Sequence, residues 1–182
     1  MNLRLKPMRN TALAMAAATA ARLAVATALA LTGACAVAVE PGQWAPDIDL
    51  PAGQVAQRLS ELRGKLVYVD FWASWCGPCR LSFPWMNDMQ RKYGPKGLQV
   101  VAINLDAKRA DADAFLARHP AAFALAFDPA GVSARRFGVL GMPSSVLIGP
   151  DGRVLYVHRG FRLDDRAELE ARLAAPLGGK TP

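Results

Sequence analysis

Cysteine and histidine are scarce in this sequence, which has three cysteines and two histidines among 182 residues. Three cysteines are too few for a small scaffold held together by disulfide bonds. Acidic residues are fewer than basic ones, 15 against 22, but residues 1–38 contain four of the basic groups and no acidic one. The other 144 residues therefore hold 18 basic and 15 acidic groups, a net charge of +3. So small a charge removes the main support for nucleic-acid binding.

Long apolar runs, internal repeats and low-complexity linkers are also missing. The apolar stretch at residues 23–34 has 12 residues, whereas a membrane-spanning helix needs about 20. Counting on to residue 39 gives 17 residues, which is at the lower limit. An apolar content of 52% excludes a disordered chain, and the length suits one domain with a substantial core.

Residues 1–38 have the order of a secretory signal peptide, with a basic leader, a short apolar segment and then small residues. Three outcomes are open. An A-x-A motif predicts cleavage after Ala38, a segment resembling a bacterial lipoprotein box predicts lipidation of Cys35, and an uncleaved segment would act as an N-terminal membrane anchor. Each outcome places residues 39–182, the expected folded domain, outside the cytoplasm. We therefore expect the protein in the periplasm.

The rest of the chain predicts strands that alternate with helices. Apolar runs rich in β-branched and aromatic residues predict the strands, and apolar spacing with Gly and Pro stops predicts the helices. The expected strands are 66–72, 98–104, 123–127, 145–148 and 154–157, and the expected helices are 76–93, 108–118, 129–137 and 164–174. Parallel β-α-β units followed by a hairpin and a helix predict a small α/β sandwich.

Cys76 and Cys79 directly follow the first of these strands and open the first helix, an arrangement suited to dithiol–disulfide exchange. A helix N-terminus stabilises a thiolate, which lowers the pKa of Cys76, whereas Cys79 is shielded one turn inside. A zinc site would need about four ligands, and the only other candidates, Cys35, His119 and His158, lie at no ligand spacing. A purely structural disulfide would stabilise little across so short a loop. We expect no metal, and no cofactor besides the redox-active cysteine pair.

Residues 69–80, Val-Asp-Phe-Trp-Ala-Ser-Trp-Cys-Gly-Pro-Cys-Arg, closely resemble the active-site segment of the thioredoxin superfamily. More narrowly, the chain resembles the exported TlpA/ResA-like thiol–disulfide oxidoreductases. They share Ala-Pro-Asp at 45–47, Leu-Arg-Gly-Lys at 62–65, Gly-Met-Pro at 141–143, and an extra central strand–helix unit at about 98–119. The resemblance implies a thioredoxin-like α/β fold, with a mixed central sheet flanked by helices and a TlpA-like central strand–helix insertion.

The resemblance also implies roles for individual residues. Cys76 would attack a substrate disulfide and Cys79 would resolve the mixed disulfide, while Pro143 matches the cis-proline beside the active site. Asp70 matches the buried acid that takes a proton from the resolving cysteine; read alone, it is a hydrogen-bonded core residue. The residues expected to contact substrate are Trp75, Gly77, Pro78 and Met142. The implied partners are protein disulfide substrates and a membrane thiol–disulfide electron donor.

The dipeptide between the cysteines, Gly-Pro, is that of thioredoxin and indicates a disulfide reductase. Cytochrome c maturation is one role in the family, although relatives specialised for it usually carry Glu where Ser144 stands. Many relatives also carry Glu at the position of Ser82. A thiol peroxidase of peroxiredoxin type would need Thr in place of Ala73, and a copper-binding module of this fold would use CxxxC. These two classes are the alternatives to a reductase.

Overall fold

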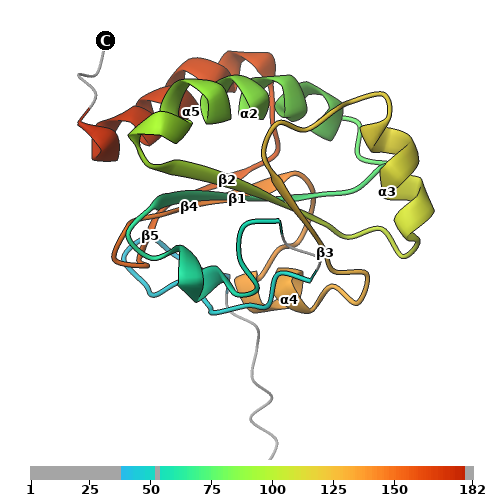
Figure 1. The fold of residues 1–182 in the computed structure, drawn as a ribbon, viewed down its shortest axis with the longest axis horizontal. Helices are drawn as coiled ribbons and strands as arrows, with labels where there is room; N and C mark the ends of the chain where they lie inside the picture. The colour runs from blue at the N-terminus through green and yellow to red at the C-terminus, as the bar shows by residue number, and fades with distance from the viewer. Residues whose placement is uncertain (1–37, 52–53, 179–182) are drawn as a thin grey trace, which may run out of the picture. The chain divides into compact units, whose positions relative to one another are not determined.

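The computed structural model describes residues 38–51 and 54–178, whose elements form one compact unit. At its centre is a five-stranded sheet in the order β3-β2-β1-β4-β5 (Figure 1). The strands are β1 (Leu66–Trp72), β2 (Leu98–Asn104), β3 (Ala124–Phe127), β4 (Ser144–Ile148) and β5 (Val154–Arg159). Strands β1, β2 and β3 are parallel, whereas β4 is antiparallel to both β1 and β5. The sheet is therefore mixed, as the thioredoxin resemblance implies.

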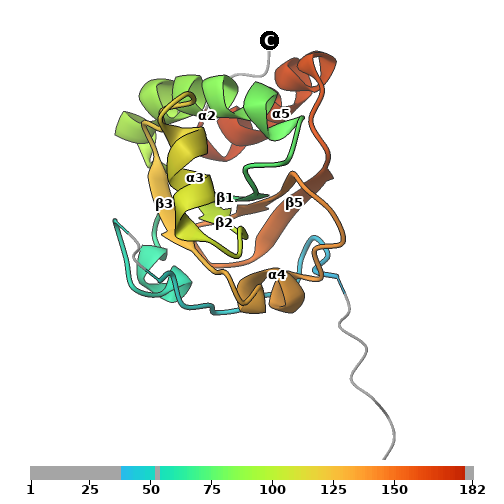
Figure 2. The same ribbon diagram turned by 90° about the vertical axis from the view of Figure 1, so that its right-hand side faces the viewer.

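Helices cover both faces of this sheet. The α-helices are α2 (Cys79–Tyr93), α3 (Arg109–Leu116), α4 (Val132–Phe137) and α5 (Arg166–Ala174). Short 3₁₀ helices are η1 (Leu59–Leu62), η2 (Gly94–Lys96), η3 (Leu163–Asp165) and η4 (Ala175–Leu177). Helices α2, α3 and α5 pack on one face, and α4, η1 and the segment before β1 pack on the other (Figures 1 and 2). Among the described residues, no helix combines the length and apolar character needed to cross a bilayer.

Strand β1 is buried along its whole length because both of its faces are covered. Tyr68 and Trp72 point to the α2 face and join its apolar cluster, while Val69 and Phe71 join the cluster on the α4 face. Asp70 follows the same alternation and belongs with Tyr68 and Trp72. The single acid of this strand therefore lies on the face that α2 covers.

The two central strands match their predicted bounds residue for residue, but the first helix begins three residues later than predicted, at Cys79. Residues before it form turns instead: the backbone N–H of Cys76 donates to the carbonyl of Ala73 at 3.1 Å. The N–H of Arg80 donates to the carbonyl of Gly77 at 3.2 Å, an i→i−3 bond typical of a tight first turn. Cys76 thus lies just before the helix, with the free N–H groups of the first turn ahead of it.

Candidate active site

Cys76 and Cys79 form a disulfide where β1 leads into α2, with their Cα atoms 5.4 Å apart. Cys79 is fully buried and Cys76 is 4% exposed, while Trp75 beside them is 69% exposed. The backbone N–H of Cys79 donates to Sγ of Cys76 at 3.3 Å. A donor at a helix N-terminus that is aimed at this sulfur favours the thiolate over the thiol once the disulfide is reduced.

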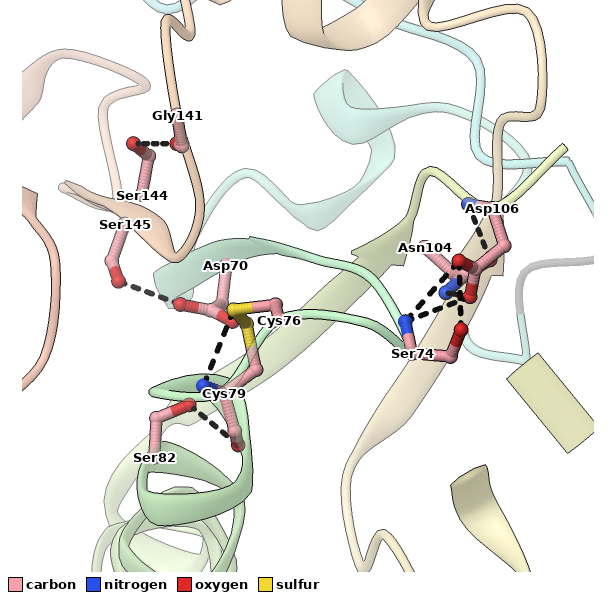
Figure 3. The surroundings of a disulfide bond; sticks show 10 residues. All are labelled: Asp70, Ser74, Cys76, Cys79, Ser82, Asn104, Asp106, Gly141, Ser144 and Ser145. Carbon is pink, nitrogen blue, oxygen red and sulfur yellow. Dashed lines mark hydrogen bonds between the residues drawn. A yellow bond between two sulfur atoms is a disulfide. The ribbon is translucent and has the colours of Figure 1, made fainter. Parts of the chain in front are cut away.

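Asp70 is the buried carboxyl group on the α2 face of the sheet, and its residue is 1% exposed. Its Oδ1 accepts a hydrogen bond from the Ser145 hydroxyl at 2.7 Å, and its Oδ2 has no partner among the described residues (Figure 3). Burial raises the pKa of Asp70 to about 7, and the Ser145 hydrogen bond opposes this rise. A carboxyl group with a pKa near neutrality can exchange a proton at physiological pH.

The loop before β4 reaches the same end of the sheet. The Met142–Pro143 peptide bond is cis, as the family resemblance implies. Ser144, the next residue, pairs with Phe71 near the end of β1, which places the loop beside the segment that carries the disulfide. Met142 is half-buried and packs against the cluster that contains both cysteines. The neighbouring Leu140 is 92% exposed, and nothing in the sequence distinguished it from a core residue.

The structure also adds residues that sequence reasoning missed. Ser74, which lies in the loop before Cys76, forms a hydrogen-bonded group with Asn104 and Asp106 (Figure 3). Ser145 is the partner of the buried acid. These contacts join positions up to 75 residues apart in the chain, so hydrophobic patterning contains no sign of them. The one available sign was the polar pair Asn104 and Asp106, of which Asn104 ends a buried strand and Asp106 follows it.

Along the sequence, the two histidines are far from the cysteine pair and from each other. His119 packs against Phe115 in a tilted ring pair, with ring centroids 4.6 Å apart. His158 pairs with Ser145 across β4 and β5, and its Nε2 lies 3.4 Å from a carboxylate oxygen of Asp165. Among the described residues, no group of three or more His, Cys, Asp or Glu side chains could hold a metal ion. Ser82 is buried and donates to the Cys79 carbonyl at 3.2 Å.

Comparisons with known proteins agree with this geometry. The family model described as Redoxin matches residues 40–173. The thiol-disulfide oxidoreductase ResA of Bacillus thuringiensis is 31% identical over 141 residues, which cover 76% of this chain and 80% of that protein. ResA of Oceanobacillus iheyensis is 33% identical over 132 residues, which cover 70% of this chain and 69% of that protein.

A crystal structure from Chlorobium tepidum, described as a candidate thiol:disulfide interchange protein DsbE, is similar in both fold and sequence. It superposes with a TM-score of 0.74 at 56% identity and covers 78% of this chain and all of its own. A solution structure from Bacteroides thetaiotaomicron, described as a candidate protein disulfide isomerase, gives a TM-score of 0.69 at 27% identity and covers 77% of this chain and 91% of its own. The chain therefore belongs to the Redoxin family, as a ResA-like thiol–disulfide oxidoreductase of the thioredoxin superfamily.

Proposed function

We propose that this protein reduces disulfide bonds of other proteins outside the cytoplasm. The observation that carries the proposal is the difference in environment between the two cysteines. Cys76 receives a backbone N–H at its sulfur, whereas Cys79 is fully buried. One cysteine is thus suited to attack as a thiolate, and the other is suited to remain a protonated thiol until the mixed disulfide forms.

In the first step, the Cys76 thiolate attacks one sulfur of a substrate disulfide. A bond forms between Cys76 and that sulfur, the substrate S–S bond breaks, and the released substrate thiolate takes a proton from water. Substrate would lie against the exposed residues beside the disulfide, which are Trp75, Gly77 and Pro78, and against the cis-proline loop at Met142.

In the second step, Cys79 transfers its thiol proton to Asp70 and attacks Cys76. The new Cys76–Cys79 bond forms as the mixed disulfide breaks, and the second substrate sulfur leaves as a thiolate with the electron pair of that bond. Over both steps the substrate gains two electrons and the enzyme dithiol is oxidised to a disulfide. Asp70 supports this role because it lies on the α2 face, is buried, and has a pKa raised to about 7. A dithiol donor at the membrane, itself oxidised to a disulfide, would then restore both thiols.

The reducing direction follows from Gly77 and Pro78, because the strongest oxidants of this fold stabilise the thiolate with His between the cysteines. Less stabilisation of the reduced form makes the disulfide harder to reduce. Equilibration of the full-length protein with glutathione or dithiothreitol should therefore place the Cys76–Cys79 couple below about −220 mV. A potential near about −120 mV, with efficient oxidation of reduced unfolded proteins, would reverse the direction.

The leader in residues 1–38 supports export to the periplasm. Disulfides between the haem-binding cysteines of apocytochromes c are one substrate class within the family. Ser144 stands where relatives specialised for that substrate usually carry Glu, which favours a broader range of protein disulfides. Substituting Cys79 with Ala would stall the mixed disulfide at Cys76 and allow the substrate to be identified.

A further inference from the structure

The loop of residues 73–78, which carries Cys76, is tied to a buried carboxylate on the neighbouring strand connection. Asp106 is only 5% exposed, and both of its carboxylate oxygens accept from the backbone N–H of Ser74, at 2.9 and 3.2 Å. The hydroxyl of Ser74 also donates to Oδ1 of Asp106, at 3.0 Å. The Asp106 side chain therefore binds both the backbone N–H and the hydroxyl of Ser74 (Figure 3).

Asp106 is itself held in place by the end of β2. The side-chain amide of Asn104 donates to Oδ2 of Asp106 at 2.8 Å, and the backbone N–H of Asp106 donates back to Oδ1 of Asn104 at 3.0 Å. The N–H of Leu105 donates to the carbonyl of Trp72 at 2.9 Å, which joins the ends of the two parallel strands. The carboxylate is thus fixed relative to the sheet before it binds the loop.

Ser74 lies inside the turn that positions Cys76. The N–H of Cys76 closes this turn on the carbonyl of Ala73 at 3.1 Å, and Sγ of Cys76 then receives the N–H of Cys79 at 3.3 Å. We propose that Asp106 is a positioning residue of the redox site, which holds this turn so that the Cys76 sulfur stays against the first turn of α2. The inference rests on the proposed function, because it assigns the attacking thiolate to Cys76.

The chemistry of the group requires a carboxylate. Three donors converge on Asp106: the backbone N–H and the hydroxyl of Ser74, and the amide of Asn104. An ionised carboxylate accepts at both oxygens and presents no donor, whereas an amide would turn an NH₂ group toward one of these donors. Hydrogen bonds to a charged acceptor are also the stronger kind. Asp106→Asn should therefore weaken the group even though the side chain keeps its shape.

The sign of the effect separates positioning from a simple charge effect. Loss of the carboxylate should free the turn, weaken the Cys79 N–H contact with the sulfur and raise the pKa of Cys76. A charge effect through space would act in the opposite sense, because removing a nearby negative charge favours the thiolate. A purely structural role would lower the melting temperature of the protein and leave the pKa of Cys76 unchanged.

The experiment measures the pH dependence of Cys76 alkylation by iodoacetamide in the full-length protein after reduction with dithiothreitol. Asp106→Ala and Asp106→Asn should each slow alkylation near pH 7 about tenfold. This factor corresponds to the loss of one hydrogen bond to a charged group, here the bond from the Cys79 N–H to the Cys76 thiolate. Ser74→Ala removes only the hydroxyl bond and should have a smaller effect in the same direction. No protein substrate is needed, so this result is independent of the direction of the redox reaction.

Asp128 provides the matched control. It is 7% exposed, and its carboxylate accepts from the N–H and the hydroxyl of Ser133, at 2.6 and 2.5 Å. Its side-chain bonds reach α4 and not the loop of residues 73–78. Asp128→Ala should therefore destabilise the fold without changing Cys76 alkylation. An unchanged or lowered Cys76 pKa in folded Asp106→Asn would overturn the inference; if Asp106→Ala fails to fold, Asp106→Asn and Ser74→Ala still decide it.

Discussion

At the scale of single residues, Asp70 combines a proposed proton-transfer role with an energetic cost. Its carboxyl group is buried on the α2 face, and Ser145 donates the hydrogen bond at Oδ1. The second carboxylate oxygen has no partner among the described residues. Burial of an ionised group with one unsatisfied oxygen disfavours the charged form, which is why its pKa rises.

This cost predicts the pH dependence of stability. In the unfolded chain Asp70 releases its proton near its ordinary pKa of 3.8, whereas the oxidised native protein holds it up to about pH 7. The native state therefore binds more protons between these values, and the free energy of unfolding should fall as the pH rises from about 4 to 7. Asp70→Asn should remove this fall and stabilise the oxidised protein above pH 7 by about 4 kcal/mol at most. Urea unfolding at several pH values measures both effects.

Ser145→Ala serves as the comparison, because it removes the hydrogen bond that lowers the pKa of Asp70. It should extend the fall in stability to higher pH, in contrast to Asp70→Asn. The same Asp70→Asn protein should reduce insulin more slowly, mostly above neutral pH, while its redox potential changes little. Identical stability curves for wild type and Asp70→Asn would contradict the raised pKa, and unchanged insulin kinetics would return Asp70 to the role of a core hydrogen-bonding residue.

The sequence predicted the residues near the disulfide better than it predicted their partners. The sequence could predict Cys76, Cys79 and the cis bond before Pro143, because a local string of residues identifies them. It could not predict the roles of Ser145 and Asp106, because each acts through a contact between distant segments whose register depends on the assembled sheet. A polar residue in a strand indicates only that a partner is needed, and the sequence does not name that partner.

At the scale of elements, the buried strands could be predicted closely because continuous apolar runs leave little choice of conformation. The start of α2 could not, since Gly77 and Pro78 suit a turn as well as a first helical turn. In the segment before β1, isolated bridges join Trp44 to Arg153 and Asp49 to Arg58. The cover that this segment gives to the α4 face depends on tertiary packing.

A contact between α4 and the segment before β1 leads to a prediction on stability. Gly138, directly after α4, has a φ of +65°, and an added Cβ would lie 2.3 Å from the Cα of Ala38. The neighbouring Val39 is 5% exposed, and its N–H donates to the Phe137 carbonyl at 3.3 Å. In the full-length protein, which keeps Ala38, Gly138→Ala should displace this segment and destabilise the domain by about 2–4 kcal/mol, from left-handed strain and lost burial of Val39. Urea unfolding measures the loss.

Gly131→Ala is the matched control at the other end of the same helix. Gly131 has a φ of +63°, but the nearest atom to an added Cβ is the terminal Nη1 of the Arg135 side chain, at 3.5 Å. The Gly131→Ala variant should lose stability through left-handed strain alone, by about 1–2 kcal/mol. Equal losses of stability in the two variants would mean that the segment at residues 38–39 contributes nothing to the fold.

At the scale of the whole molecule, the described domain contains the cysteine pair, and the proposed location rests on the N-terminal region. The prediction of a leader covers residues 1–38, of which 1–37 lie outside the described residues. The three processing outcomes would give a free protein, a lipid-anchored protein or one held by its N-terminus, each with a different access to substrates.

The expected outcome is cleavage after Ala38. The new N-terminus would be Val39, whose amino group could still donate to the Phe137 carbonyl that its backbone N–H now contacts at 3.3 Å. Intact mass of the protein from periplasmic and membrane fractions should show a soluble form that begins at Val39. Ala36→Leu should block this cleavage by removing a small residue from the A-x-A motif, and Cys35→Ser should leave it unchanged. A diacylglycerol mass on Cys35, lost in Cys35→Ser, would instead identify a lipoprotein, and a membrane-bound chain of full length would identify an anchor.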